Sequence, residues 1–141
     1  MIVKFKKLSQ NAQIPTYGTS GSACFDFYSA DKLTIIRAGD MQAIKTGLAI
    51  EIPEGHALMI YSRSGHGYKR VALANCVGVI DSDYRGEIKI LMKNDGFFHL
   101  DVNPGDRIAQ GMIIPVNQVT FEEGELSDTV RGTGGFGSTG Q

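Results

Sequence analysis

The sequence predicts an all-β sandwich or barrel, because short apolar or alternating runs recur along the chain and turn residues separate them. Alternation of apolar and polar residues is typical of half-buried strands. Glycine supplies 18 of the 141 residues, about 13% against a usual ~7%, which indicates many tight turns. Sustained 3.6-residue periodicity is absent, so we do not expect a helical fold.

The expected strands cover residues 2–5, 23–28, 33–36, 43–52, 57–61, 77–80, 87–92, 97–102 and 108–119. Glycine, proline, asparagine and aspartate form turn signals between them, at 37–40, 53–55, 94–96 and 103–106. One short helical turn is expected around 67–73. An acidic stretch and a glycine-rich end then follow, so residues 1–120 are predicted to form a barrel core and residues 121–141 an arm.

Composition narrows the classes of function. Fourteen Lys and Arg against fifteen Asp and Glu give a net charge of −1, so we expect neither nucleic acid nor a membrane as a partner. The apolar runs are far shorter than the ~20 residues of a membrane span, and residues 1–10 lack the apolar region of a signal peptide. Cys24 and Cys76 share no metal spacing and predict reduced thiols in a cytoplasm, or a host cytoplasm if the source is a virus.

The segment 131–141 reads RGTGGFGSTGQ and has the residues of a phosphate-covering loop. Its glycines can turn several N–H groups toward one anion. Arg131 offers a planar fork, Ser138 and Thr139 offer donors, and Phe136 could lie on a base. The G-x-G-x-x-G within it lacks the preceding strand and following helix of a dinucleotide site. The alternative is a disordered glycine tail.

Two further segments carry groups that suit an anion. At the end of an expected strand, Arg63, Ser64 and Gly65 combine a charged fork with a hydroxyl and a small residue. The amide of Gln110 can donate to phosphate or accept from a base. Taken alone, both segments are better explained as ordinary turns, with Ser64 as a cap.

Asp81 is the candidate general base. It directly follows an apolar run, so its carboxylate can be held rigidly and can deprotonate a water molecule. Residues 81–86 are interpreted as a hairpin turn between two strands, with Asp83 as a solvated turn residue. Turn geometry alone would also explain these residues.

Several active-site patterns are absent from the sequence. There is no H-x-E with P-C-x-x-C, so zinc deaminase chemistry is unsupported. His56, His66 and His99 share no ligand spacing, and no G-x-S-x-G nucleophile elbow occurs. In the segment that leads to Gln110, Asp106 and Arg107 could pair with each other or with a neighbour.

Together, five segments resemble the five motifs of the trimeric deoxyuridine triphosphatases in order and spacing, at residues 22–28, 63–65, 75–87, 105–110 and 131–140. The resemblance spans nearly the whole chain. It implies a jelly-roll-like distorted barrel, a homotrimer, and active sites at subunit interfaces that take motifs from more than one chain. The flexible glycine-rich arm would close over bound nucleotide.

The implied reaction is hydrolysis of dUTP to dUMP and pyrophosphate, which limits uracil in DNA and supplies dUMP for dTTP synthesis. A water molecule held by Asp81 would attack the α-phosphorus. The implied cofactor is Mg²⁺, held mostly by phosphates and water, and Asp26 would reach its water shell.

The resemblance also implies the residues that bind the substrate. Phosphate binding falls to Arg63, Ser64, Gly65 and Gln110. The arm residues that hold the γ end and cover the uracil are Arg131, Phe136, Gly137, Ser138 and Thr139. The residues implied to contact the base and the sugar are Asn75, Gly78, Val79, Ile80 and Tyr84. Lys89 is implied to be a further substrate-binding residue. The Tyr84 ring would pack under the deoxyribose and crowd out a 2′-OH.

Four places depart from the family's usual motifs. Cys24 replaces a glycine, Phe27 a leucine and Ser62 a proline, and Cys76 with Val77 stands where Ala-Pro is usual. These changes affect packing and turn stiffness more than chemistry.

Two alternatives remain. The dCTP deaminases share the fold and much of the motif order, but need a glutamate as proton shuttle in the strand of the third motif, whereas Glu87 here follows the expected hairpin. A binding or regulatory protein could instead keep the nucleotide pocket as a switch.

Overall fold

The computed structural model describes residues 1–136 and 138. Within these residues the chain forms twelve strands and one short helix, and every strand pair is antiparallel. The predicted all-β class is therefore confirmed. In chain order the elements are β1 (Lys4–Lys7), β2 (Thr16–Tyr17), β3 (Phe25–Tyr28), β4 (Thr34–Ile36), β5 (Met41–Lys45), β6 (Leu48–Glu51), β7 (His56–Tyr61), α1 (Ser64–Tyr68), β8 (Val71–Leu73), β9 (Gly78–Ile80), β10 (Lys89–Asn94), β11 (Leu100–Val102) and β12 (Arg107–Pro115).

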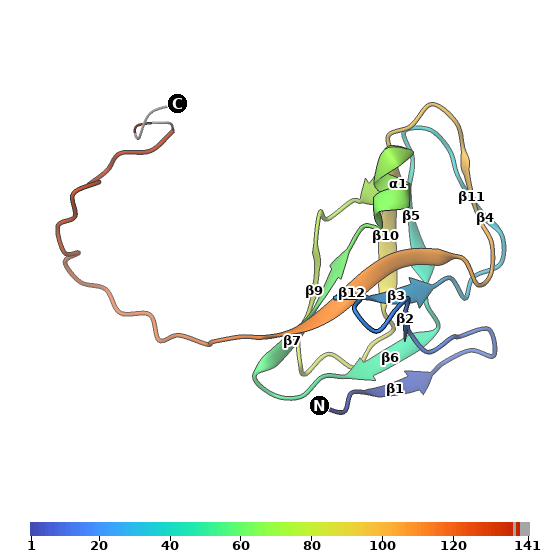
Figure 1. The fold of residues 1–141 in the computed structure, drawn as a ribbon, viewed down its shortest axis with the longest axis horizontal. Coiled ribbons are helices and arrows are strands. Elements are labelled where there is room, and N and C mark those ends of the chain that lie inside the picture. Colours follow the sequence, from blue (N-terminus) through green and yellow to red (C-terminus); the bar gives the residue numbers. More distant parts are fainter. Residues whose placement is uncertain (137, 139–141) are drawn as a thin grey trace.

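The long strand β12 is the centre of the largest sheet, whose order is β2-β3-β12-β7-β9. A three-stranded sheet has the order β5-β10-β8, and β1–β6 and β11–β4 form two pairs. Figure 1 shows β12 running across the barrel from the end near α1 and β11 to the point where the arm leaves. The arrangement is the expected jelly-roll-like barrel.

Alternation in the strands separates the core from the functional surface. In β3, Phe25 and Phe27 are buried while Asp26 and Tyr28 between them are only partly so. Each fully buried large apolar side chain contributes roughly 1.5–3 kcal/mol. The largest fully buried apolar side chains are Phe27, Ile36, Ile44, Leu48, Ile50, Leu58, Ile88, Ile90, Met92 and Ile108.

The expected single strand over 43–52 is wrong, because the chain bends at Thr46 and Gly47 between β5 and β6. Gly47 has a φ of +65°, and a Cβ there would lie 2.9 Å from the Cβ of Ala12. The left-handed backbone and the close approach both require glycine at this bend.

The helical turn lies earlier than expected, at Ser64–Tyr68, and Val71–Leu73 is strand β8. Arg70 has a φ of 60°, which ends the turn, and β8 then pairs with β10. The hairpin interpretation of residues 81–86 is also wrong. Strand β9 pairs with β7 while β10 pairs with β5 and β8, so this segment crosses between two sheets.

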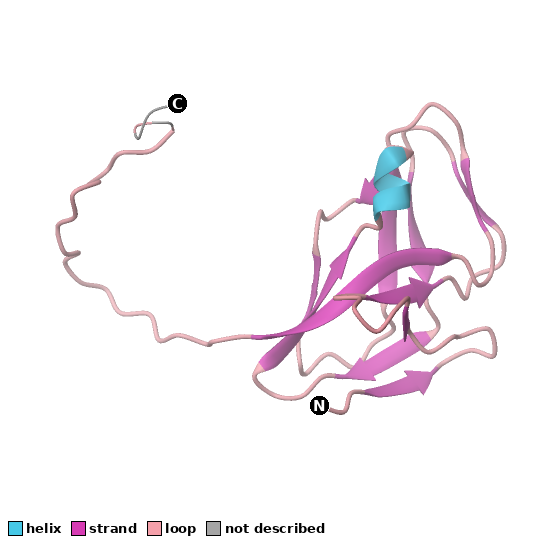
Figure 2. Cartoon of the chain, viewed as in Figure 1, coloured by secondary structure: helices cyan, strands magenta, loops and turns pink. Residues whose placement is uncertain are grey.

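Strand β12 ends at Pro115, four residues earlier than expected, and residues 116–136 form no helix or strand. Figures 1 and 2 show this arm extending away from the barrel. None of the helices in the described part of the chain is long and apolar enough to cross a membrane.

Candidate active site

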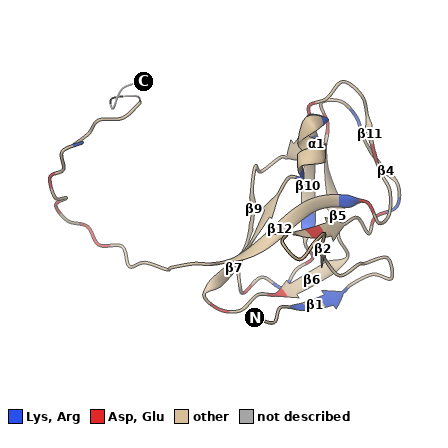
Figure 3. Cartoon of the chain, viewed as in Figure 1, with Lys and Arg blue, Asp and Glu red and all other residues tan. Residues whose placement is uncertain are grey.

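A polar cluster centred on Asp26 lies on β3 where it pairs with β12. The Oδ1 atom of Asp26 accepts a hydrogen bond from Arg63 Nε at 2.8 Å, and its Oδ2 atom accepts one from Arg107 Nη1 at 3.4 Å. The Asp26 side chain is only 14% exposed. Figure 3 shows this juxtaposition of acidic β3 and basic β12. Both oxygens are engaged by arginines, a geometry that suits orientation of Arg63, whereas the metal role of Asp26 stays a prediction.

Gln110 lies at the same level of the sheet, because it is opposite Asp26 in β3 and Tyr61 in β7. Its Nε2 donates to the carbonyl of Ser62 at 2.9 Å. The hydroxyl oxygen of Ser62 in turn accepts from the N–H of Leu73 at 2.9 Å, which ties this turn to β8. The serine at this departure from the family motif therefore supplies a bond that proline cannot make.

Arg63 caps α1 with an extended backbone, and Ser64 and Gly65 form its first turn. The carbonyl of Arg63 accepts from the N–H groups of His66 and Gly67. The N–H groups of Ser64 and Gly65 have no partner within the helix, as is usual for a first turn. Both residues are exposed, so their amides and the Ser64 hydroxyl are open to a ligand beside the Arg63 guanidinium.

A cavity of about 300 Å³ adjoins this cluster. Arg63, Lys69 and Arg107 line it together with His66, and Asp101 and Asp106 are also among its lining residues. Burial lowers the pKa of His66 from its ordinary value, and the nearby Arg63 and Lys69 lower that pKa further. His66 is thus held neutral, and the fixed positive charge comes from the arginines and the lysine.

Asp81 lies at the opposite end of β7. It directly follows β9, whose Ile80 is opposite Leu58. Arg63 is about six residues further along the extended chain, which corresponds to about 20 Å at the usual strand rise. One copy of the chain therefore does not bring Asp81 to the Arg63 cluster.

The surroundings of Asp81 include a cavity of about 670 Å³. It is lined by Glu54 just before β7, by His56 at the start of β7, by Val79, and by Val116 at the root of the arm. The N–H of Val116 donates to the carbonyl of Gly55 at 2.8 Å, so the arm leaves the barrel beside Asp81. The predicted position of Asp81 at the end of a strand is confirmed.

The loop before β9 carries the predicted base-binding residues. Asn75 is exposed, and its carbonyl accepts from Val77 N at 2.6 Å in a tight turn. Gly78 is buried. A Cβ at this position would lie 3.2 Å from the Cβ of Ile60. Val79 is exposed and Ile80 half-buried in β9. Asn75, Val79 and Asp81 are therefore among the exposed residues of this segment.

Tyr84 follows on the same segment. Its N–H donates to the carbonyl of Asp81 at 3.2 Å, and its hydroxyl donates to the carbonyl of Glu87 at 3.1 Å. Lys89 is exposed at the start of β10, opposite Lys45. Tyr84 and Lys89 thus lie on the segment that runs from β9 into β10.

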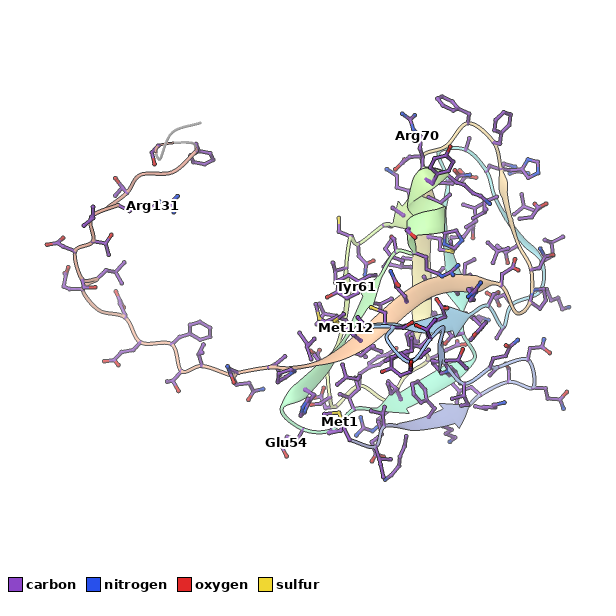
Figure 4. The ribbon with its side chains drawn as sticks, viewed as in Figure 1. Met1, Glu54, Tyr61, Arg70, Met112 and Arg131 are labelled. Carbon is purple, nitrogen blue, oxygen red and sulfur yellow. The ribbon has the colours of Figure 1, made fainter. Side chains whose placement is uncertain are left out.

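The arm holds the remaining predicted residues away from both clusters. Arg131 Nε donates to the carbonyl of Gly134 at 2.9 Å, and Phe136 and Ser138 are exposed. Figure 4 shows Arg131 far from Tyr61 in the barrel. Gly137 and Thr139 lie outside the described residues.

Sequence reasoning missed two members of the Asp26 cluster. Arg107 pairs with Asp26, not with Asp106, whose carboxylate accepts from the N–H of Asn103 at 2.7 Å. For Ser62, the sequence indicates only a departure from the family's usual proline. No local pattern signals these contacts, because both depend on strand pairing between distant segments.

The fold is that of a class of all-β nucleotide hydrolases, to which the similar solved structures belong. The dUTPase of Staphylococcus bacteriophage 80alpha, solved with dUpNHpp, matches with a TM-score of 0.90 at 28% identity over 99% of each chain. The dUTPase of phage phi11 matches with a TM-score of 0.82 at 25% identity, over 89% of this chain and 98% of that one.

Sequence comparisons are stronger still. The dUTPase family model matches residues 10–140. The deoxyuridine 5′-triphosphate nucleotidohydrolase of Nautilia profundicola is 48% identical over the full length of both chains. That of Helicobacter pylori is 39% identical over 99% of this chain and 97% of its own. The chain belongs to the dUTPase family, whose members are hydrolases acting on dUTP.

Proposed function

We propose that this chain hydrolyses dUTP to dUMP and pyrophosphate in sites assembled from more than one copy, with Asp81 as the general base. The observation that carries the proposal is the separation of Asp81 from Arg63 by about 20 Å along β7. A single copy offers two half-sites, and a homotrimer would bring the half-site of one copy to that of its neighbour. We also propose that the protein acts in the cytoplasm.

In this proposal the Arg63 half-site holds the phosphates. Arg63 supplies a guanidinium fixed by Asp26, and Ser64 and Gly65 supply open N–H groups beside it. The Gln110 amide is held at the same level by Ser62. A guanidinium and backbone amides are the donors that suit phosphate oxygens.

The Asp81 half-site would then hold the uracil, the sugar and the attacking water. Asn75 and the backbone around Val79 supply polar groups for the edge of the base, and Tyr84 supplies a ring for the sugar. The Asp81 carboxylate accepts a proton from water as the oxygen bonds to the α-phosphorus and the bond to the β-phosphate breaks. The products are dUMP and pyrophosphate.

The residues of this chain fit a metal that the substrate itself holds. The described residues contain no group of three or more His, Cys, Asp or Glu side chains that could hold a metal ion, and arginines engage both oxygens of Asp26. Mg²⁺ commonly keeps phosphate and water ligands. When bound, it would offset the charge of the phosphates. The phi11 structure concerns coordination of a structural Mg(II) ion in that protein.

The arm would complete the site from a further copy. It leaves the barrel beside Asp81 and its described end is exposed, so its Arg131, Phe136 and Ser138 are free to reach a neighbouring copy. Gly137, Thr139 and Lys89 remain predicted substrate contacts.

The test compares Asp81→Asn with Asp83→Asn, using pyrophosphate release from dUTP, dCTP, dTTP and UTP with Mg²⁺. Loss of the base should lower kcat for dUTP by about 10²–10⁴-fold while affinity for a non-hydrolysable analogue persists. Asp83→Asn, two residues away in an exposed turn, should keep the wild-type rate. Hydrolysis by Asp81→Asn at the wild-type rate would contradict the assignment, and ammonia from dCTP would favour a deaminase.

A further inference from the structure

The ring of Tyr84 lies directly against the backbone of Gly86. A Cβ built on Gly86 would fall 2.5 Å from Cζ and 3.0 Å from Cε2 of that ring, and closer still to its hydroxyl oxygen. Real Cβ atoms do not approach other atoms this closely. Only a hydrogen at this position leaves room for the ring.

Backbone conformation does not explain the glycine. The residues with a positive φ in the described chain include Gly39, Gly47, Gly55 and Gly105, but not Gly86. Gly86 therefore does not adopt the left-handed backbone that favours glycine over alanine. What a Cβ at this position would disturb is the place of the Tyr84 ring.

The backbone beside Gly86 is anchored to the bend between β5 and β6. The Oε1 atom of Glu87 accepts from Gly47 N at 3.1 Å. The N–H of Ile88 donates to the carbonyl of Leu48 at 2.8 Å, and the Ile88 carbonyl accepts from both N and Oγ1 of Thr46. This segment resists displacement, whereas the Tyr84 side chain is 43% exposed and can swing outward.

We propose that Gly86 is a positioning residue for Tyr84 and, through that ring, a determinant of the preference for deoxyribose over ribose. The inference rests on the proposed function in one respect, the place of Tyr84 under the sugar. A methyl group at position 86 would push the ring from its seat and open the space that a 2′-OH needs. Binding of the base and the role of Asp81 do not require Gly86.

The experiment measures kcat/KM for dUTP and for UTP in Gly86→Ala. The ratio of the two should fall by about 10- to 100-fold, the range typical for steric rejection of a small group. Gly21→Ala is the matched control, because a Cβ at Gly21 meets no atom within 4 Å. Its ratio and its Tm should equal those of the wild type.

Two variants separate this inference from the proposed function. Tyr84→Ala should lower the ratio by itself, and Gly86→Ala added to it should change the ratio no further. A wild-type ratio in Gly86→Ala, with a lowered one in Tyr84→Ala, overturns the role of Gly86 and leaves the proposed function standing. A wild-type ratio in Tyr84→Ala overturns the sugar role of Tyr84 itself.

The same pair keeps the test decisive if Gly86→Ala folds poorly. The three atoms nearest to a Cβ at Gly86 all belong to the Tyr84 side chain, so Tyr84→Ala should restore the Tm that Gly86→Ala loses. A double variant that stays as unstable as Gly86→Ala would contradict the steric argument.

Discussion

Asp26 shows how one side chain organises a half-site. Two guanidinium groups reach its two oxygens from β12 and from the end of β7, and its side chain is largely buried between them. Charge-assisted hydrogen bonds of this kind are stronger than neutral ones. The pair with Arg63 at 2.8 Å fixes the direction of a guanidinium that would otherwise sample many rotamers.

Asp26→Asn keeps the shape of the side chain and removes its charge. We expect the free energy of unfolding to fall by about 1.5–3 kcal/mol, the usual contribution of hydrogen bonds to charged groups, and kcat/KM for dUTP to fall because Arg63 loses its orientation. Urea denaturation and steady-state kinetics measure these changes.

Glu51→Gln is the control, because it makes the same exchange in the exposed Lys4–Glu51 pair. Exposed pairs contribute little, so its stability and activity should stay near the wild-type values. An equal loss of stability in both variants would show that the burial of Asp26 has no special effect.

At the scale of elements, the bend between β5 and β6 joins the core to the active site. Gly47 makes the bend, and its N–H donates to the Glu87 carboxylate behind Tyr84. The neighbouring Thr46 hydroxyl donates to the carbonyl of Ile88 at 2.7 Å. The geometry of the loop at 84–88 therefore depends on the bend.

Gly47→Ala and Gly55→Ala form a matched pair, since both glycines have a positive φ. Alanine in a left-handed conformation costs about 1–2 kcal/mol at either place. At Gly47 the new methyl group also meets the Cβ atoms of Ala12 at 2.9 Å and Ala30 at 3.0 Å, while at Gly55 it meets nothing within 4 Å. Chemical denaturation should show Gly47→Ala to be less stable than Gly55→Ala by about 1–3 kcal/mol. Equal stabilities would contradict this packing account.

Strands with clear alternation were predictable, such as β3, β7 and β10, because burial of one face leaves a period of two in the sequence. The bend at Gly47 was not, since apolar residues continue on both sides of it. Strand β2 has two residues, and β8 depends on its pairing with β10. Neither β2 nor β8 could be predicted from a local sequence pattern.

The candidate site, like the fold, was predictable only in part from the sequence. Residue types and their order along the chain predict Asp81, Arg63 and Gln110 as site residues, because each motif carries a group that suits the expected chemistry. The contact of Arg107 with Asp26 and that of Tyr84 with Gly86 depend on three-dimensional approach. The separation of the two half-sites depends on the pairing of β7 with β9 and β12.

At the scale of the whole molecule, one copy presents unfinished surfaces. The two half-sites lie at opposite ends of β7, and the arm carries exposed Phe121, Leu126 and Phe136 away from the barrel. Large apolar side chains rarely stay exposed in such numbers on one segment without a partner surface. Assembly of several copies could bring a half-site of one copy to the other half-site of its neighbour. It could also give the exposed apolar side chains of the arm a surface to pack on.

The most direct test of this account is complementation between two inactive variants, Asp81→Asn and Arg63→Gln, co-expressed with different tags and purified as mixed assemblies. If Asp81 and Arg63 of one site come from different copies, about a quarter of the sites in a random equal mixture carry both wild-type residues. We therefore predict dUTP hydrolysis well above that of either variant alone. A mixed assembly no more active than its two parents would contradict the shared site.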